Sequence, residues 1–594
     1  MSTPRFHESR RLRRRPPLRT RTLTIVPSYR LKLVFFILCL GLSGLMGRAA
    51  WLQLLQAPLL EAYARSSQIQ RTLPLGQRRS IVDRNGRLLA LDEERFRLWA
   101  HPIIFRFPGD SQGEIRSLKE VAQKLSTPLG KSVNELMQTL KTKSSGVRLA
   151  EDITPETATE INALQISGLD LEAYPQRVYP QADLFANVIG FLNDDRVPQA
   201  GLEQSLNKKF LRQEKAYTLK RGGVIREPDV FNNDNHELHL TLDTRLQKVA
   251  LNELRSQVLK WNARKGVAIV MDSSNGEILA LASTPSYDPN KFWEYSPSLF
   301  REWSVQDLFE PGSVFKPINL ALALEEGAIS PKGTVYDSGV VNVGGWALKN
   351  WNHKANGVMD YAKVLQVSSN VGMVNIMKNL SSIKYWEWLN RLELDKKTET
   401  DLPGAIGGEL KAKEIFLDQS IHHAVASFGQ GFSITPLKLA QLHAVIANGG
   451  KLVTPHVTKG FSSKKNTEAH NSVDNSQVLS QEVTRIVLDW MESVVDEGSG
   501  KGVKTEPYRI AGKTGTADQW ENGKLSSKIC SFVAILPVEA PRFVVVVAVD
   551  DPKKEYAYGS TVAVPVAKKI IESLLVLEKI PPSLDKNSLA SLKD

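Results

Sequence analysis

A basic N-terminal arm followed at once by an apolar segment constrains this chain more than any other feature. Residues 1–32 contain ten Arg or Lys residues and one acidic residue, Glu8, and so carry nine of the chain's +12 net charge. Residues 33–47 carry no charge, and the apolar character continues after Arg48 to Leu55. About 20 apolar residues span a bilayer, and a basic flank remains in the cytoplasm. We therefore expect a single transmembrane helix at 33–55 with the N-terminus in the cytoplasm.

Two other interpretations of this arm are weaker. A cleaved signal peptide would have an unusually long basic region, and Ala49-Ala50 followed by the bulky Trp51 is a poor cleavage site. A nucleic-acid-binding arm would not be followed directly by a spanning segment, and the rest of the chain is close to neutral. We expect no nucleic-acid partner.

Length and cysteine content narrow the class further. The chain has 594 residues, of which 42% are hydrophobic, and is too long for one ordinary domain. Its two cysteines, Cys39 in the expected span and Cys530 in an apolar segment, cannot form a disulfide scaffold or a Cys-rich metal site. No His-Glu-x-x-His pattern occurs, and we expect no metal or other cofactor.

Between residues 56 and 236 the pattern of apolar and polar residues changes every few residues. Residues 78–90 predict a strand with a turn at Asn85-Gly86, and residues 118–125 and 133–140 predict short amphipathic helices. This region has no internal repeat and no catalytic cluster. Arg78 and Asp83 are expected to have structural roles, in an ion pair or a turn.

From residue 237 onward, strands and helices are predicted more clearly. Predicted strands lie at 238–242, at 266–272 and 277–283 as a hairpin, and at 529–536 and 543–549 as apolar central strands. Predicted helices lie at 245–261, 315–324, 358–377, 436–447 and 481–495. This order favours a mixed α/β class, with one mixed, mainly antiparallel sheet flanked by helices.

The segment Glu310–Pro317 places a serine where it can be activated. Its breaker residues precede an apolar helix, so Ser313 lies at a helix N-terminus with Lys316 one turn later on the same face. A lysine buried among apolar groups loses its proton more readily and can act as the base for a serine hydroxyl. Free N–H groups at the helix start can stabilise an oxyanion.

Ser-x-x-Lys alone is weak, because it occurs five times, beginning at Ser205, Ser313, Ser381, Ser462 and Ser583. Two later motifs single out Ser313. Ser368-Ser369-Asn370 falls within the predicted helix 358–377, and Lys513-Thr514-Gly515-Thr516 follows the strand-like residues 508–510. A Ser-His-Asp triad is disfavoured, because His353 and His422-His423 have no motif context and no Gly-x-Ser-x-Gly elbow occurs.

These three motifs, in this order, are typical of penicillin-binding proteins and serine β-lactamases. The chain resembles the class B penicillin-binding proteins, membrane-anchored peptidoglycan D,D-transpeptidases, and is most similar to the septal cell-division type. Further segments that carry the resemblance are 78–86, 177–180, 201–203, 240–247, 276–290, 428–436 and 447–450. Two departures are Arg78-Arg79 where the family has Arg-Gly, and Gly498-Ser499-Gly500 where it often has Gly-Thr-Gly.

The resemblance implies a role for each motif residue. Ser313 would attack the carbonyl between the two terminal D-alanines of a stem peptide and become acylated, with Lys316 as general base. Ser368 would relay a proton to the leaving D-alanine, and Asn370 would hold the substrate amide and Lys316. Lys513 would attract the terminal carboxylate. Residues 514–516 (Thr514, Gly515 and Thr516) would bind substrate, and the N–H groups of Ser313 and Thr516 would form the oxyanion hole.

The expected organisation has five parts. They are a basic arm at 1–32, a transmembrane helix at 33–55, an elongated α+β pedestal at 56–236 that resembles the family's dimerisation domain, a transpeptidase domain at 237–576 with the penicillin-binding and serine β-lactamase-like fold, and a tail at 577–594. The pedestal is too short for a glycosyltransferase. A membrane glycan polymerase and other division proteins are therefore the implied partners, beside stem peptides and β-lactams.

The implied location is the bacterial cytoplasmic membrane, with a single pass, the catalytic domain outside the cytoplasm and a position at the division septum. Several alternatives remain open. They are an elongation-type transpeptidase, a D,D-carboxypeptidase that uses water as acceptor, a β-lactamase or β-lactam sensor, and an inactive division scaffold.

Overall fold

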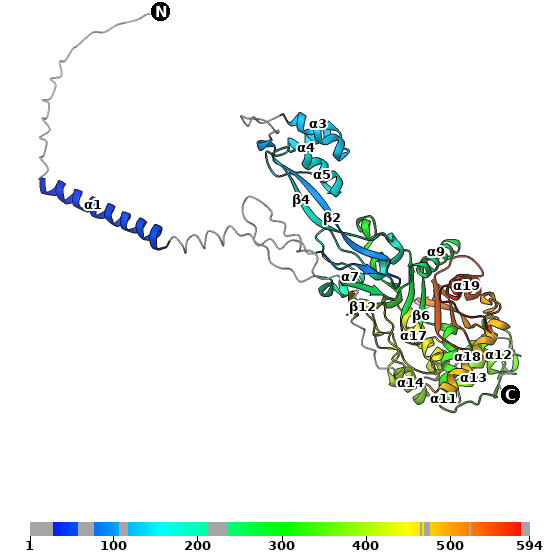
Figure 1. The fold of residues 1–594 in the computed structure, drawn as a ribbon. Helices are drawn as coiled ribbons and strands as arrows, with labels where there is room; N and C mark the ends of the chain where they lie inside the picture. Colours follow the sequence, from blue (N-terminus) through cyan, green and yellow to red (C-terminus); the bar gives the residue numbers. More distant parts are fainter. Residues whose placement is uncertain are drawn as a thin grey trace, which may run out of the picture. The chain divides into compact units, whose positions relative to one another are not determined.

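The computed structural model describes residues 28–56, 77–105, 117–211, 236–463, 466–467, 476–521 and 524–583. The chain divides into two units, one of residues 1–74 with 215–228 and one of residues 75–214 with 229–594. Figure 1 shows the helices and strands of both units.

The described part of the first unit is one helix. Helix α1 (Ser28–Ala50) continues into a π-helical turn, η1 (Trp51–Leu55). Its stretch Lys32–Gln53 has a mean hydropathy of 1.9 and leaves its apolar side chains uncovered, and in the described part of the chain it alone has the length and composition to cross a membrane. The helix expected at 33–55 is therefore present. Cys39 lies exposed on it, Cys530 is buried in the second unit, and both thiols are free.

The first part of the second unit is a small α+β lobe on a long strand pair. Its helices are α3 (Leu118–Leu129), α4 (Val133–Leu140) and α5 (Pro155–Ala163), and its strands are β2 (Leu88–Ala100), β3 (Val147–Ile153) and β4 (Leu169–Val178). Ser117, Ser132 and Thr154 cap the three helices with their hydroxyls. The helices predicted at 118–125 and 133–140 are confirmed.

The strands of the lobe belong to a seven-stranded sheet that joins segments far apart in the sequence. Its order is β13-β12-β5-β1-β2-β3, and β4 pairs with β2. The additional strands are β1 (Ile81–Val82), β5 (Glu237–Leu240), β12 (Thr458–Ser463) and β13 (Asn466–Thr467). The parallel pairing of β1 with β5 and the antiparallel pairing of β5 with β12 tie the base of the lobe to the C-terminal half of the chain.

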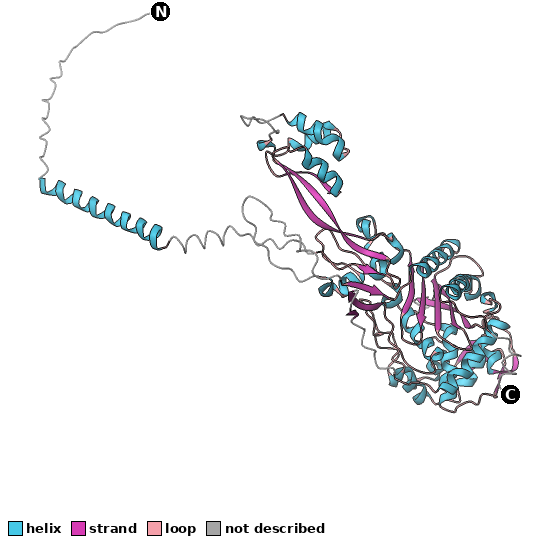
Figure 2. Ribbon diagram, in the orientation of Figure 1, coloured by secondary structure: helices cyan, strands magenta, loops and turns pink. Residues whose placement is uncertain are grey.

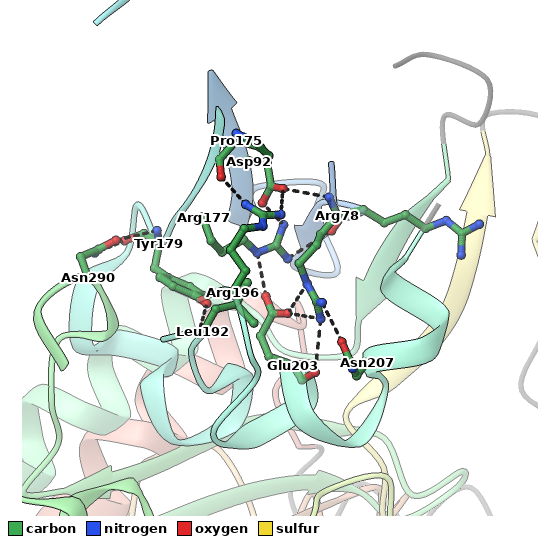
Figure 3. Close-up of polar contacts among 11 residues, drawn as sticks. Arg78, Asp92, Pro175, Arg177, Tyr179, Leu192, Arg196, Glu203, Asn207 and Asn290 are labelled. Atoms are coloured by element: carbon green, nitrogen blue, oxygen red, sulfur yellow. Dashed lines mark hydrogen bonds and ion pairs between the residues drawn. The ribbon is translucent and has the colours of Figure 1, made fainter. Parts of the chain in front are cut away.

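At the base of the lobe, a network of buried charged side chains joins five segments of the chain (Figure 3). Glu203 accepts hydrogen bonds from Arg78 Nε at 2.9 Å and from Arg177 Nε at 2.7 Å. Asp92 pairs with Arg177 at 3.2 Å and with Arg196 at 2.6 Å. Because each carboxylate serves two guanidinium groups, the network fixes the strands and helix α7 (Gly201–Ser205) against one another. Arg78 thus has the structural role expected from the sequence.

Asp83 also has the expected structural role, in the turn that follows β1. Its Oδ1 accepts from the N–H groups of Asn85 and Arg87, and its Oδ2 accepts from the Thr244 hydroxyl at 2.6 Å. The turn at Asn85-Gly86 is thereby attached to the first residue of helix α9 (Thr244–Lys260).

The C-terminal part of the second unit is built on a five-stranded antiparallel sheet in the order β14-β15-β16-β6-β7 (Figure 2). The strands are β6 (Lys265–Asp272), β7 (Ile278–Thr284), β14 (Ala511–Glu521), β15 (Lys524–Leu536) and β16 (Phe543–Asp550). Along β16, Val544 and Val546 enter one core while Val545 and Val547 enter the other. Both faces are therefore covered, as the continuous apolar sequences predict.

Helices form a layer on each face of this sheet. Helices α9 and α19 (Gly559–Leu577) pack on one face, and α17 (Pro436–Ala447) and α18 (Gln481–Asp496) pack on the other. The remaining helices are α6 (Ala186–Ile189), α8 (Asn207–Phe210), α10 (Trp303–Gln306), α11 (Lys316–Glu325), α12 (Tyr361–Gln366), α13 (Asn370–Met377), α14 (Ser382–Arg391), α15 (Lys413–Asp418) and α16 (Ser420–Ala426). The expected mixed α/β class, with a mainly antiparallel sheet flanked by helices, is confirmed, and every strand of this sheet runs antiparallel to its neighbours. After α19, Ile580 is buried and Glu578 pairs with Arg84.

The prediction of one helix over 358–377 is wrong. Residues 357–360 form strand β11 (Gly357–Asp360), and the helical part is split into α12 and α13. The break falls at Ser368, whose φ of +56° is left-handed, and at Ser369, whose hydroxyl caps α13 by accepting from Gly372 N–H. Serine competes with the helix for backbone hydrogen bonds, and an apolar pattern does not reveal this.

The charge network predicts a large loss of stability when one carboxylate is removed. Glu203→Gln leaves two buried guanidinium groups short of a counter-charge and should lower the free energy of unfolding by about 3–5 kcal/mol. Urea denaturation of the full chain in detergent measures it. Glu151→Gln is the control, because Glu151 pairs with Arg148 on the surface and should cost less than about 1 kcal/mol. Equal losses in the two variants would refute this role of the network.

Candidate active site

Ser313 lies at the start of a helical segment, as predicted. Residues 312–315 form a 3₁₀ turn, η6 (Gly312–Phe315), that leads directly into α11, whose first residue is Lys316. The Lys316 side chain is fully buried, whereas Ser313 is partly exposed. Pro317, in the first turn of α11, costs no helical hydrogen bond.

The Lys316 ammonium group is enclosed by the second motif. Lys316 Nζ donates to Ser368 O at 2.7 Å and to Asn370 Oδ1 at 2.8 Å, and it lies 3.3 Å from Ser368 Oγ. The backbone carbonyl and the amide oxygen are acceptors only. A neutral lysine has two N–H bonds and one lone pair. Once the two acceptors hold both N–H bonds, the lone pair remains available to a hydroxyl proton.

Lys513 comes to the same serine from the third motif. Its Nζ donates to Ser368 Oγ at 2.9 Å and to Thr514 O at 2.8 Å, and its side chain is also fully buried. Lys316, Ser368, Asn370 and Lys513, which lie up to 197 positions apart in the sequence, therefore form one connected cluster.

Burial changes the proton affinity of both lysines. It lowers the pKa of Lys316 well below 10.5, the nearby charge of Lys513 lowers it further, and Asp337 opposes this shift. Burial also lowers the pKa of Lys513 to about 7. The two amines compete for protons, so that one can be neutral while the other carries the positive charge.

The third motif lies in strand β14 itself, at the edge of the sheet, and not after a strand at 508–510 as the sequence predicted. An edge strand leaves alternate N–H groups without a partner strand. A Cβ atom at Gly515 would lie 2.4 Å from Ser531 Oγ and 3.0 Å from a Val314 methyl group. Only glycine lets β14 approach the residue beside Ser313 this closely.

The threonines of the motif have further partners. Thr516 Oγ1 accepts from Gly559 N–H at 3.1 Å, and Thr514 Oγ1 lies 2.5 Å from Ser499 Oγ. The departure at Gly498-Ser499-Gly500 therefore keeps a hydroxyl in contact with Thr514, since serine and threonine share that group. Tyr558, the residue before Gly559, lies with its ring 5.8 Å from that of Trp351.

Sequence motifs did not reveal several residues that support the cluster. Asp337 and Asn350 hold the segment 368–370 through hydrogen bonds and follow no spacing rule. Gly429 belongs to the segment 428–436 and accepts from Gly312 N–H at 2.8 Å. A Cβ atom there would lie 2.1 Å from Gly312 O. Its positive φ of +82° and this close contact explain why glycine occurs beside the turn that bears Ser313.

Comparisons with known proteins agree with this architecture. Residues 266–572 match the penicillin binding protein transpeptidase domain, and residues 75–218 match the penicillin-binding protein dimerisation domain. The chain therefore belongs to the penicillin-binding proteins that carry a transpeptidase domain. The expected resemblance is confirmed.

Curated relatives and a solved structure refine the assignment. The chain is 35% identical over 589 residues to a peptidoglycan D,D-transpeptidase FtsI homolog of Mesostigma viride, covering 93% of this chain and 97% of that protein. It is 32% identical over 583 residues to peptidoglycan D,D-transpeptidase FtsI of Escherichia coli K12, covering 94% of each. A peptidoglycan synthetase of Bifidobacterium adolescentis shares the fold, with a TM-score of 0.66, 26% identity and coverage of 86% and 97%. The chain is a class B penicillin-binding protein of the division type.

Burial of Lys513 predicts a pH-dependent contribution to stability. Its pKa is about 7 in the folded chain, against the ordinary lysine value of 10.5 when the side chain is exposed on unfolding, so the unfolded chain binds more protons between these values. The stability of the parent therefore rises with pH across this window. Relative to Lys513→Met, it should rise by roughly 2–4 kcal/mol between about pH 7 and about pH 10.

Urea denaturation of both proteins at the two pH values measures this difference. Lys248→Met is the matched control, because Lys248 is exposed on α9 and its loss should leave the pH dependence of the parent unchanged. A difference between parent and Lys513→Met that stays constant with pH would contradict the burial of a titrating amine.

Proposed function

We propose that this chain is a septal peptidoglycan D,D-transpeptidase that cross-links stem peptides through an acyl-enzyme on Ser313 and is inhibited by β-lactams. The observation that carries this proposal is the joint contact of Lys316 and Lys513 with Ser368, directly beside the turn that bears Ser313. This cluster can remove a proton from one hydroxyl and return it to a leaving amine.

In the first half-reaction, Ser313 Oγ attacks the carbonyl carbon between the two terminal D-alanines. Its proton passes to the lone pair of Lys316 Nζ. The C–N bond then breaks, and the proton reaches the departing D-alanine amine through Ser368 Oγ. The products are an ester on Ser313 and free D-alanine, so atoms and charge balance.

Substrate binding uses the third motif. Lys513 supplies positive potential for the terminal carboxylate of the donor peptide, and the hydroxyls of Thr514 and Thr516 donate hydrogen bonds to it. The N–H groups of Ser313 and Thr516 form the oxyanion hole. The edge position of β14 and the tight approach at Gly515 support this assignment.

In the second half-reaction, the amine of a neighbouring stem peptide attacks the ester carbonyl. Lys316 accepts the amine proton and returns it to Ser313 Oγ as the ester bond breaks, and the new amide is the cross-link. Water in place of the amine would make the chain a carboxypeptidase. The product distinguishes the two, because only the transpeptidase forms peptide dimers.

Membrane attachment by α1, with a cytoplasmic basic arm and an external catalytic domain, also belongs to this proposal. The length and apolar surface of α1 and the charge of residues 1–32 support it. Residues 56–236 are too short for a glycosyltransferase domain, so a membrane glycan polymerase and other division proteins are the proposed partners. Protease protection of the full chain tests the topology. Digestion of the catalytic domain from the cytoplasmic side would refute it.

Covalent labelling tests the nucleophile. The full chain should bind a fluorescent penicillin covalently, and Ser313→Ala should abolish the labelling because no other hydroxyl lies at the start of α11. Gel fluorescence after denaturation measures the acyl-enzyme.

Ser205→Ala is the matched control. Ser205 also precedes a lysine by three positions, but its hydroxyl donates to Asp401 O in another part of the fold, so this variant should label like the parent. If Ser313→Ala labels as strongly as the parent, the assignment of the nucleophile is wrong.

A further inference from the structure

A buried carboxylate lies behind the second motif, in a segment of four short strands. They are β8 (Thr334–Asp337), β9 (Val340–Val343), β10 (Trp346–Lys349) and β11, and most of their side chains are at least partly exposed. Asp337, the last residue of β8, is an exception with no exposed surface. A buried acid on a largely solvated element calls for a physical explanation.

Every polar contact of Asp337 comes from a donor. Its carboxylate accepts from Ser369 Oγ at 2.7 Å, from Asn350 Nδ2 at 2.8 and 3.0 Å, from Asn356 Nδ2 at 2.5 Å and from Gly339 N–H at 2.7 Å. Burial alone would raise the pKa of Asp337, but these hydrogen bonds lower it below 3.8. An ionised carboxylate suits this environment because both of its oxygens accept hydrogen bonds. The NH₂ group of an asparagine at this position would face N–H and O–H groups that are themselves donors.

The hydrogen bonds of Asp337 lead to the catalytic lysine in two steps. Because Asn350 Nδ2 is turned toward Asp337, its Oδ1 faces the other way and accepts from Asn370 N–H at 2.9 Å and from Val371 N–H at 3.1 Å. Ser369, bound to Asp337 through its hydroxyl proton, accepts from the N–H of Gly372 at 2.7 Å. The first turn of α13 is thereby held from two sides.

The segment 368–370, which leads into that turn, carries the acceptors of Lys316. Ser368 O and Asn370 Oδ1 receive the two short hydrogen bonds of the lysine, and Ser368 has the left-handed φ of +56° that a non-glycine residue adopts only when its surroundings hold it there. The position of the Lys316 lone pair therefore depends on groups that Asp337 orients.

We propose that Asp337 is a positioning residue of the acyl-transfer site, whose carboxylate orients Asn350 and Ser369 and so holds segment 368–370 where it directs Lys316 toward Ser313. Asp337 touches neither Ser313 nor Lys316 through a hydrogen bond, and it acts through the segment between them. This inference rests on the proposed function of the Ser313 site.

A change in the pH dependence of acylation distinguishes a positioning role of Asp337 from a merely structural one. The charged groups that act on Lys316 are Lys513 on β14 and Asp337 on β8. Removing the charge of Asp337 should move the acid limb of the acylation rate to lower pH, because Lys316 then loses its proton more easily. The misplaced acceptors should slow acylation at neutral pH by about 100-fold.

A reciprocal exchange offers a rescue. In Asp337→Asn with Asn350→Asp, the new carboxylate at 350 can accept from the amide at 337, from Asn370 N–H and from Ser369 Oγ, which already lies 3.3 Å from Asn350 Oδ1. The charge is kept and most donors regain an acceptor. The exchanged variant should recover most of the lost rate and the acid limb of the parent.

The experiment measures the rate of acylation of the full chain by a fluorescent penicillin across a range of pH, with thermal unfolding as a check on folding. Asp360→Asn is the matched control, because Asp360 ends β11 in the same segment, is exposed and caps α12 with an oxygen that asparagine retains. It should react like the parent.

The outcomes separate this inference from the proposed function. Parental acylation by a folded Asp337→Asn, or a folded exchanged variant as slow as Asp337→Asn, overturns the positioning role and leaves Ser313 as nucleophile. If Asp337→Asn does not fold, a folded exchanged variant with the parental acid limb supports the role, and one with a displaced limb overturns it. Failure of the parent itself to react would instead refute the proposed function.

Discussion

The burial of Lys316 is the constraint on which the rest of the site depends. A lysine at the surface would carry a proton at neutral pH and could not serve as the proposed base for Ser313. The structure removes this side chain from water, surrounds its nitrogen with Ser368 O and Asn370 Oδ1, and places a second buried amine, that of Lys513, 2.9 Å from Ser368 Oγ. Removing two amines from water costs free energy, and stable packing elsewhere in the domain offsets this cost.

The sheet meets that requirement by fixing three distant segments with close backbone contacts. Strand β14 lies against the turn that bears Ser313, the proposed nucleophile, because Gly515 has no side chain. The same turn lies against the segment after α16 because Gly429 has none. Both contacts are held by a sheet with cores on its two faces. The lobe is anchored differently, through the charge network around Glu203 and the strand pairing of β1 with β5.

Much of this could be predicted from sequence because the relevant signals are local. Local sequence patterns predicted the apolar strands 529–536 and 543–549 and the helices 436–447 and 481–495, and the structure has strands and helices at these places. Each of the three motifs is likewise a short local pattern. The helix predicted over 358–377 failed where side-chain hydrogen bonds of Ser369 override an apolar pattern. Asp337 and Asn350 could not be found, because their importance arises from contacts with residues up to 32 positions away that no periodicity marks.

Titration of Lys316 tests the central claim most directly. Selective ¹³C labelling of lysine side chains and comparison of the full chain with Lys316→Met identify the Cε resonance of this residue, whose shift can be followed with pH. The account predicts a midpoint well below 10.5, separate from those of the exposed lysines. A midpoint that coincides with those of the exposed lysines would contradict a neutral, buried base beside Ser313.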